Sequence, residues 1–372
     1  MEYFFRHTRE GGYPYGLSFN ADSTKQNSGP FSTIKALWTP ASAGVTKKSA
    51  EVTALLLVLI FTCTLILSVT ATAQDSELKL TPISPQITKF GDLSYLWGFK
   101  VESEDPKFGG FSGLTGLRSV KQGNVVHHFL GSVTDMGYYA SWEISLPATD
   151  LPSISLYPLQ PIAEEAGTAS DKINYDVEAI TEFEDWNLYA YEQDHRVVNS
   201  DPEATRISRP NNIGAIPPNG GFEAITVLKN NMLLLLAERP DRKINRQLAW
   251  LGHKQADGNF RYETRIIDLP IEYYPSDATT LINGDVILLL RKFSMLKGFS
   301  TKLIRITHDM IMSGAPITGH EIADFPSSAG FDNLEGIASM ANPAGGETLY
   351  LISDDNFNPL QKTVFLAFRL QD

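Results

Sequence analysis

Acidic residues recur at one position of a repeated sequence pattern. Five short segments, each followed by an apolar run, have an acidic or hydroxyl residue near their start: Ser112, Glu178, Glu223, Asp277 and Glu335. Carboxylates that lie close together cannot all stay ionised without a counter-charge. Ca²⁺ accepts a shell of carboxylate, carbonyl and water oxygens. If the fold brings these five side chains together, we expect them to hold Ca²⁺; the alternative is that they are solvated residues at strand starts.

A second set of acidic residues ends the apolar runs. Its members are Asp135, Glu192, Glu238, Asp354 and Asp355. The last two belong to the stretch LYLISDDNF, in which an apolar segment runs directly into adjacent carboxylates. If each run is a strand antiparallel to the strand before it, its end lies beside the start of that strand. The sequence therefore predicts one acidic face to which both sets contribute metal ligands.

Two arginines and the last acidic pair could supply further chemistry at this face. Arg239 and Arg291 directly follow the ends of two apolar runs. A guanidinium group can bind an anionic group through two parallel hydrogen bonds. Asp354 or Asp355 could act as a ligand or as the general base for an attacking water. Ordinary surface charge is the alternative interpretation of the two arginines.

The elements that position these residues are predicted to be strands. From Leu78 onward, short apolar runs alternate with Gly, Pro, Asn and Asp, and the best helical candidate, Thr307–Ser313, is short. The five units begin 66, 45, 54 and 58 residues apart, which is close to the period of a propeller blade. We predict an all-β fold, a β-propeller with six blades, in which first strands line a channel. Residues 78–104, with the strand 364–370, would supply the sixth blade; a β-sandwich is the alternative.

The first 73 residues differ from the remainder. Residues 1–44 are rich in Gly, Ser, Thr and Pro without hydrophobic periodicity, which predicts a non-native or disordered extension. Residues 45–73 contain eighteen uncharged residues, Val52–Val69, after two lysines and before Ala-Thr-Ala. This pattern is typical of a signal peptide cleaved before Gln74, with a membrane anchor as the alternative. Residues 74–372 are then one exported propeller domain, periplasmic or secreted.

Composition and missing motifs exclude several functions. A net charge of −12 disfavours nucleic acid and anionic membranes as partners. We expect a monomer that binds a small anionic ester. The single cysteine, Cys63, allows no disulfide framework. G-x-S-x-G, G-x-G-x-x-G and P-loop motifs are absent. His127 and His128 have no carboxylate at a metal-binding spacing, which predicts packing or surface roles.

The repeated units resemble a known family. The pairs GFSGL with SVTDMG, DVEAI with YE, GFEAI with AER, and NLEGI with LISDDNF are similar to the phytase-like propeller family, described as having esterase-like activity. The resemblance covers residues 108–370. It implies an exported, metal-binding β-propeller that hydrolyses phosphate esters. Family members usually have Glu-Arg at the end of the fourth unit, whereas Leu290 precedes Arg291 here.

Three functions follow as hypotheses. The first is an exported Ca²⁺-dependent hydrolase of small anionic phosphate esters. The second is a non-catalytic propeller that Ca²⁺ stabilises and that binds a ligand or a protein. The third is a lactonase or carboxylesterase on the same scaffold. The missing glutamate of the fourth unit favours the second hypothesis, and the retained arginines favour the first.

Overall fold

The computed structural model describes residues 77–162, 176–201, 203, 207–211, 213, 216, 220–238, 246–342 and 345–371. Contacts divide the chain into Met1–Ala73 and Gln74–Asp372, and every described residue belongs to the second unit. The segments 1–44 and 45–73 lie outside the described residues, so the extension and the signal peptide stay predictions. Within the described part, no helix is long and apolar enough to cross a bilayer.

Five antiparallel sheets make up the described residues, and we call them blades 1 to 5 in chain order. Blade 1 contains β4 (Phe111–Gln122), β5 (Val125–Thr134), β6 (Tyr138–Leu146), β7 (Ser153–Leu156) and β8 (Gln160–Pro161). Blade 2 contains β9 (Val177–Phe183), β10 (Trp186–Tyr191), β11 (Arg196–Asn199) and β12 (Ile207–Ser208). Blade 3 contains β13 (Phe222–Val227), β14 (Leu233–Ala237), β15 (Arg246–Lys254) and β16 (Phe260–Asp268).

The last two blades complete the ring. Blade 4 contains β17 (Tyr274–Thr280), β18 (Val286–Ser294), β19 (Gly298–Ile306) and β20 (His320–Phe325). Blade 5 contains β21 (Asn333–Ala341), β22 (Glu347–Asp354), β23 (Val364–Leu370), β3 (Leu93–Ser103), β1 (Leu78–Pro82) and β2 (Lys89–Phe90). The predicted short helix is α2 (His308–Met312), which Thr307 caps, and a 3₁₀ turn, η4 (Ser327–Ala329), precedes β21.

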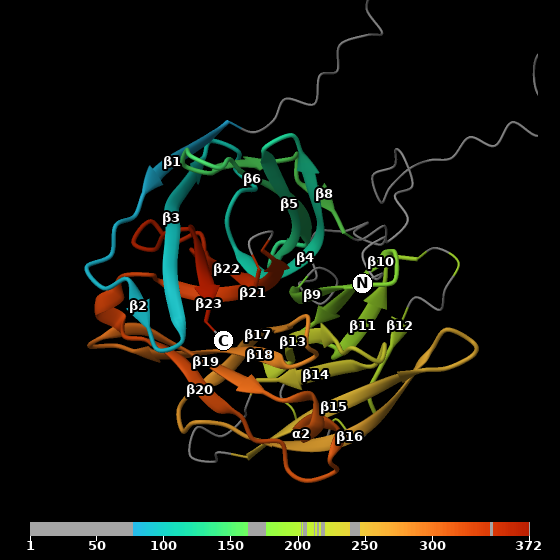
Figure 1. The fold of residues 1–372 in the computed structure, drawn as a ribbon. Helices are drawn as coiled ribbons and strands as arrows, with labels where there is room; N and C mark the ends of the chain where they lie inside the picture. The colour runs from blue at the N-terminus through green and yellow to red at the C-terminus, as the bar shows by residue number, and fades with distance from the viewer. Residues whose placement is uncertain are drawn as a thin grey trace, which may run out of the picture. The chain divides into compact units, whose positions relative to one another are not determined.

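The first strands of the blades surround a common axis. Strands β4, β9, β13, β17 and β21 each contact the next, and β21 contacts β4, so the ring is closed (Figure 1). The predicted all-β propeller is confirmed, but the predicted count of six blades is wrong for the described residues. Strand β3 pairs with β23, which in turn pairs with β22. The N-terminal segment therefore completes blade 5 instead of forming a sixth blade.

Apolar side chains fill the spaces between neighbouring blades. In β14, Leu233 and Leu235 pack against blade 2, whereas Leu234 and Leu236 pack against blade 4. Successive side chains of a strand point to opposite faces, so a strand that lies between two blades buries both faces. This burial explains the uninterrupted leucine runs of the second strands, which simple apolar–polar alternation would not predict.

A β-bulge occurs at the same place in all five blades. The pairing of the first and second strands skips one residue of the first strand, and this residue is Ser112, Glu178, Glu223, Ser276 or Glu335. Bulges re-aim side chains and are frequent beside functional sites. The predicted alignment of Asp277 with the three glutamates was therefore wrong by one residue, because Ser276 is the bulged residue of blade 4.

Asp277 instead joins the inner strands to one another. Its Oδ2 accepts hydrogen bonds from the backbone amides of Leu114 in β4 (3.0 Å) and Ile337 in β21 (2.8 Å). Its Oδ1 accepts one from Ala278 (2.8 Å). The side chain is fully buried, and burial raises its pKa well above the ordinary value while the three amides oppose that rise. One carboxyl group thus ties blades 4, 5 and 1 together.

We expect Asp277→Ala to destabilise the fold strongly. The substitution leaves three buried amides unsatisfied, at about 1–3 kcal/mol each, so a loss of roughly 3 kcal/mol or more is expected. Urea denaturation in EDTA measures it. Ser276→Ala is the matched control, because the buried Ser276 hydroxyl has no hydrogen-bond partner. Equal effects of the two substitutions would contradict the role of Asp277.

Candidate functional site

The bulged residues mark one end of the ring, which we call the mouth. In each blade, the first-strand residue two places before the bulge faces one residue of the second strand. These second-strand residues are Asp135, Glu192, Glu238, Arg291 and Asp354. The first-strand residues that they face are Gly110, Asp176, Gly221, Tyr274 and Asn333. The predicted antiparallel arrangement is confirmed. It brings the ends of the second strands to the starts of the first strands.

Two overlapping carboxylate triads lie in blades 2 and 3. Oxygens of Asp176, Glu178 and Glu192 lie within 4.8 Å of one another, and so do oxygens of Glu192, Glu223 and Glu238. Glu192 belongs to both groups. Residues from a first strand and a second strand meet in each triad, as the two predicted acidic sets require.

Asp176 is a site residue that the sequence analysis missed. It lies two residues before Glu178, and Asn333 lies two residues before Glu335. This recurrence of Asp/Asn-x-Glu in blades 2 and 5 was the signal that could have identified it. Gln193 donates a hydrogen bond from Nε2 to Asp176 Oδ2 at 2.9 Å, which orients the carboxylate.

Blade 4 differs from the other blades at the mouth. Its three equivalent positions hold Tyr274, Ser276 and Arg291, none of which is a carboxylate. Register places Arg291, and not Leu290, at the position of Glu238, so a guanidinium group replaces an acid there. Arg291 Nη1 donates to Glu335 Oε1 at 2.7 Å.

Blade 5 contributes a second group of acidic side chains. Asn333 donates from Nδ2 to Glu335 Oε1 at 2.5 Å. Asp354 is only 4% exposed and accepts a hydrogen bond from the Asn356 amide at 2.6 Å. Burial, followed by the charge of Glu335, raises the pKa of Asp354 to about 9. Among the described residues, Asp354 therefore lies beside acidic groups and forms no ion pair with a basic side chain.

The remaining predicted residues have different positions. Asp355 accepts hydrogen bonds from the amides of Gly110 and Phe357 (both 3.1 Å) and from the Thr363 hydroxyl (3.0 Å), so it holds the loop after β22 in place. The Ser112 hydroxyl donates to the Gly110 carbonyl at 3.4 Å. Asp135 lies opposite Gly110 at the mouth of blade 1. Arg239 lies outside the described residues.

The charge of the cluster favours a bound cation. Burial raises the pKa of Glu178 well above its ordinary value, and the charges of Glu223 and Asp176 raise it further. Burial does the same for Glu223, although the Arg291 guanidinium opposes the shift. A hard divalent cation with oxygen ligands would relieve both effects. The donors in the two triads are all carboxylate oxygens, which fits Ca²⁺ and not a soft metal.

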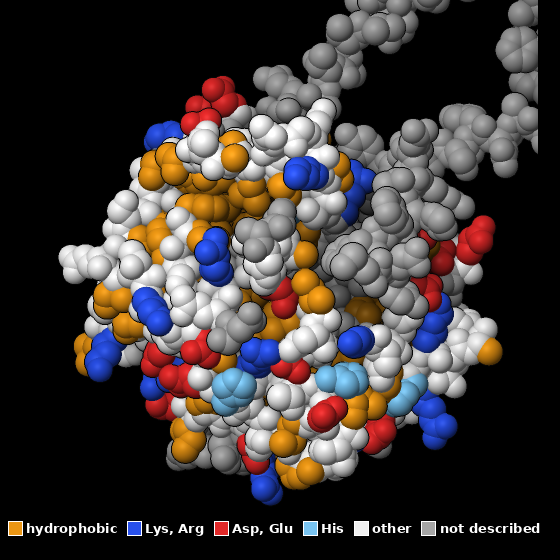
Figure 2. Space-filling model, viewed as in Figure 1, with side chains coloured by type: hydrophobic (Ala, Val, Ile, Leu, Met, Phe, Trp, Pro, Cys, Tyr) orange, Lys and Arg blue, Asp and Glu red, His pale blue; other side chains and the backbone are white. Residues whose placement is uncertain are grey.

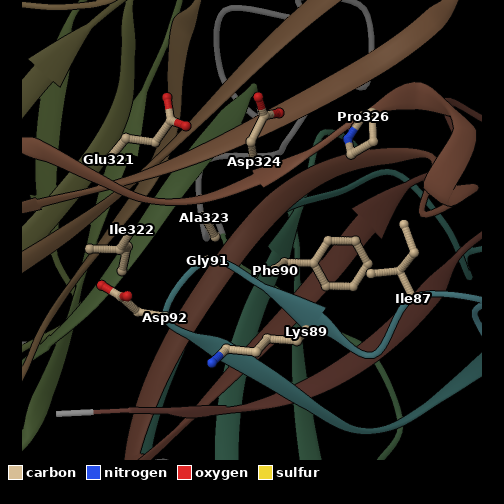
Figure 3. A pocket seen from close by; sticks show the side chains of 10 residues that line it. All are labelled: Ile87, Lys89, Phe90, Gly91, Asp92, Glu321, Ile322, Ala323, Asp324 and Pro326. Atoms are coloured by element: carbon tan, nitrogen blue, oxygen red, sulfur yellow. The ribbon is translucent and has the colours of Figure 1, made fainter.

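Two other polar features lie away from the mouth. His127 Nδ1 lies 2.8 Å from Glu143 Oε1, so His127 has a carboxylate partner on the neighbouring strand that the sequence spacing did not reveal. His128 is fully buried, as the packing interpretation predicted. A groove of about 460 Å³ lies between β2 and β20. Figure 3 shows that the side chains of Glu321 and Asp324 point to the same side. Lys302 pairs with both of these carboxylates, at 2.5 and 2.9 Å.

Most carboxylates of the mouth are buried. On the face in Figure 2, acidic side chains lie among lysine, arginine and histidine side chains. Glu192, Glu223, Glu335 and Asp354 are buried. Negative charge is therefore concentrated inside the end of the ring, where it is poorly screened by solvent.

Comparison with known proteins identifies a family. The family model described as "Phytase-like: Esterase-like activity of phytase" matches residues 106–357. No curated protein matches the sequence.

Similarity to solved structures is low. A gluconolactonase from Xanthomonas campestris is 9% identical (79% of this chain and 96% of that chain covered, TM-score 0.37). A GH43 β-xylosidase/α-arabinofuranosidase from a compost microbial metagenome is 9% identical (78% and 94% covered, TM-score 0.38). The PQQ-bound aldose sugar dehydrogenase of Streptomyces coelicolor is 12% identical (79% and 98% covered, TM-score 0.33).

The mouth predicts a pH dependence of stability. In EDTA, the free energy of unfolding is expected to fall as the pH rises from about 5 to about 9. Folded Asp354 keeps its proton up to a pKa of about 9, whereas the unfolded chain releases it near its ordinary pKa of about 4. The folded state then binds more protons than the unfolded state, so a rising pH favours unfolding.

Urea denaturation at several pH values measures this dependence. Asp354→Asn should make the decline shallower, and the raised pKa values of Glu178, Glu223 and Asp277 should maintain the remainder. Asp257→Asn should leave it unchanged, because Asp257 lies in the exposed β15–β16 turn and its pKa is lowered. A wild-type profile without a decline would refute the prediction.

Proposed function

The chain belongs to the phytase-like family, and we propose that it is an exported hydrolase of phosphate esters that depends on a divalent cation, with Ca²⁺ as the preferred ion. The observation that carries the proposal is the pair of carboxylate triads that share Glu192, next to the guanidinium group of Arg291. A cation site and an anion-binding group thus lie at the same mouth. Export follows from the apolar segment 52–69, which lies outside the described residues.

Five carboxylates would hold the cation: Asp176, Glu178, Glu192, Glu223 and Glu238. A bound Ca²⁺ would offset part of the local negative charge and would polarise phosphoryl oxygens and water. Without the cation, burial raises the pKa values of Glu178 and Glu223. With the cation bound, both side chains would be stable as carboxylates. The chain therefore supplies a pre-arranged oxygen shell.

Arg291 would bind the phosphoryl group. One of its N–H groups donates to Glu335, and a guanidinium has five N–H donors, so others can reach substrate oxygens. The side chain is 28% exposed, which gives a ligand access from solvent. Asp354, held by the Asn356 amide, would accept the proton of the attacking water only in its ionised form, which in the cation-free site is reached above its pKa of about 9.

A second candidate is a non-catalytic propeller that Ca²⁺ stabilises. The observation that favours it is the direct ion pair between Arg291 and Glu335, which already occupies part of the guanidinium group. Such a protein would bind Ca²⁺ and melt at a higher temperature with it, but would turn over no ester. A lactonase or carboxylesterase would use the same cation with an uncharged carbonyl substrate.

Glu223→Gln should abolish hydrolysis and weaken Ca²⁺ binding by at least tenfold. The substitution removes a buried carboxylate from one triad. Full-length protein is assayed on phosphate monoesters, lactones and carboxylic esters, with Ca²⁺ or with EDTA. Glu263→Gln is the matched control, since Glu263 lies on β16 with a side chain that is 56% exposed.

The outcomes separate the three functions. Phosphate release that requires Ca²⁺ and Glu223 supports the proposal. Ca²⁺-dependent melting without turnover of any ester supports the non-catalytic protein, and turnover confined to lactones or carboxylic esters supports the third function. Hydrolysis that is unaffected by EDTA would rule out a cation-dependent mechanism.

A further inference from the structure

We infer that Arg291 fills a cation position of the mouth with its own fixed charge, so that the mouth binds one divalent cation, in blades 2 and 3. This inference rests on the cation site of the proposed function, but not on the hydrolysis. It assigns Arg291 the role of setting the number of bound metal ions.

The first argument is the register of the blades. Four of the five equivalent second-strand positions are acidic, namely Asp135, Glu192, Glu238 and Asp354, and the fifth is Arg291. The first strand has the same backbone pattern in each blade: the residue that faces this position is followed, two residues later, by the bulge. Arg291 thus projects from a position at which the other blades place a potential metal ligand.

The second argument is the contacts of the guanidinium group. Arg291 Nη1 lies 2.7 Å from Glu335 Oε1, and the Glu335 side chain is only 7% exposed. Arg291 also interacts electrostatically with Glu223 and Glu238. Its positive charge therefore lies between the acids of blade 3 and those of blade 5. A metal ion held by Glu335 would have to displace Arg291 or lie against a like charge.

The third argument is the set of oxygens at the mouth of blades 4 and 5. Asn333 Oδ1 and Ser276 Oγ are buried oxygens without hydrogen-bond partners among the described residues. Asn333 lies against Glu335 through its Nδ2, and Asp354 pairs with Asn333 across the strands. These four residues offer two carboxylates, an amide oxygen and a hydroxyl, which is a donor set that Ca²⁺ accepts. Removal of the guanidinium group would therefore open a second cation site.

Calcium stoichiometry tests the inference directly. Isothermal titration calorimetry with CaCl₂ on the full-length, metal-stripped chain should give one ion for the wild type and for Arg291→Lys, which keeps the charge. Arg291→Glu should bind two ions, and Arg291→Gln should bind the second ion at least tenfold more weakly than Arg291→Glu does. Arg305→Gln is a matched control and should bind one ion, because Arg305 pairs with Asp285 at 2.8 Å, outside the mouth.

Circular dichroism first establishes that each variant is folded. If Arg291→Glu does not fold, a weak second ion in Arg291→Gln that is absent from Arg291→Lys supports the inference. Two ions in the wild type, or one in both Arg291→Glu and Arg291→Gln, would overturn it. No ion in the wild type would overturn both this inference and the proposed cation site. One ion without ester hydrolysis would overturn only the proposed activity.

Discussion

The carboxyl group of Asp277 accepts hydrogen bonds from backbone amides of three inner strands. The geometry of the mouth depends on how closely these bonds hold the strands together. Inner strands approach very closely there: a Cβ on Gly336 would lie 2.9 Å from the Cβ of Leu114. The residues that directly follow the bulges are accordingly small in four blades, namely Gly113, Ala179, Ala224 and Gly336. Asp277 is the exception, and it is tolerated because neighbouring amides satisfy its oxygens.

Close approach of the strands has an electrostatic consequence. Five first strands that meet at one axis bring every bulged residue to the same end of the ring, so acids that are far apart in the sequence become neighbours. Burial then prevents water from screening their charges. The raised pKa values of Glu178 and Glu223 follow from this packing. Protons, a guanidinium group or a cation at the mouth would each reduce the repulsion among these acids.

Much of this arrangement could be predicted from the sequence. Repeated acidic positions indicated a propeller, and the antiparallel pairing of two strands predicted which acids would meet. Precision was limited in blade 4, because its acid lies one residue after the bulge, at a position that is Gly or Ala in the other blades. Asp277 was thus aligned with Glu223 in place of Ser276, and Leu290 with Glu238 in place of Arg291. Only the register of hydrogen bonds reveals these offsets.

The number of blades was hidden for a different reason. Strand β3 lies near the start of the described chain and β23 near its end, and their pairing joins residues more than 250 positions apart, such as Phe99 and Phe365. The sequence analysis did group these two segments, but in a separate blade, because no local pattern shows that β23 also pairs with β22. Closure of the ring through blade 5 becomes evident only when the strands are paired in space.

Asymmetry of the mouth is the feature that most constrains its chemistry. Blades 2 and 3 contribute five acids, and blade 4 contributes two hydroxyl groups and a guanidinium group at the equivalent positions. A uniform acidic ring would attract cations from every side and repel an anionic substrate. With one basic sector, the same ring can hold a cation on one side and present N–H donors on the other. Under the proposed function, a phosphate ester would use both sectors, whereas an uncharged carbonyl would gain little from the guanidinium group.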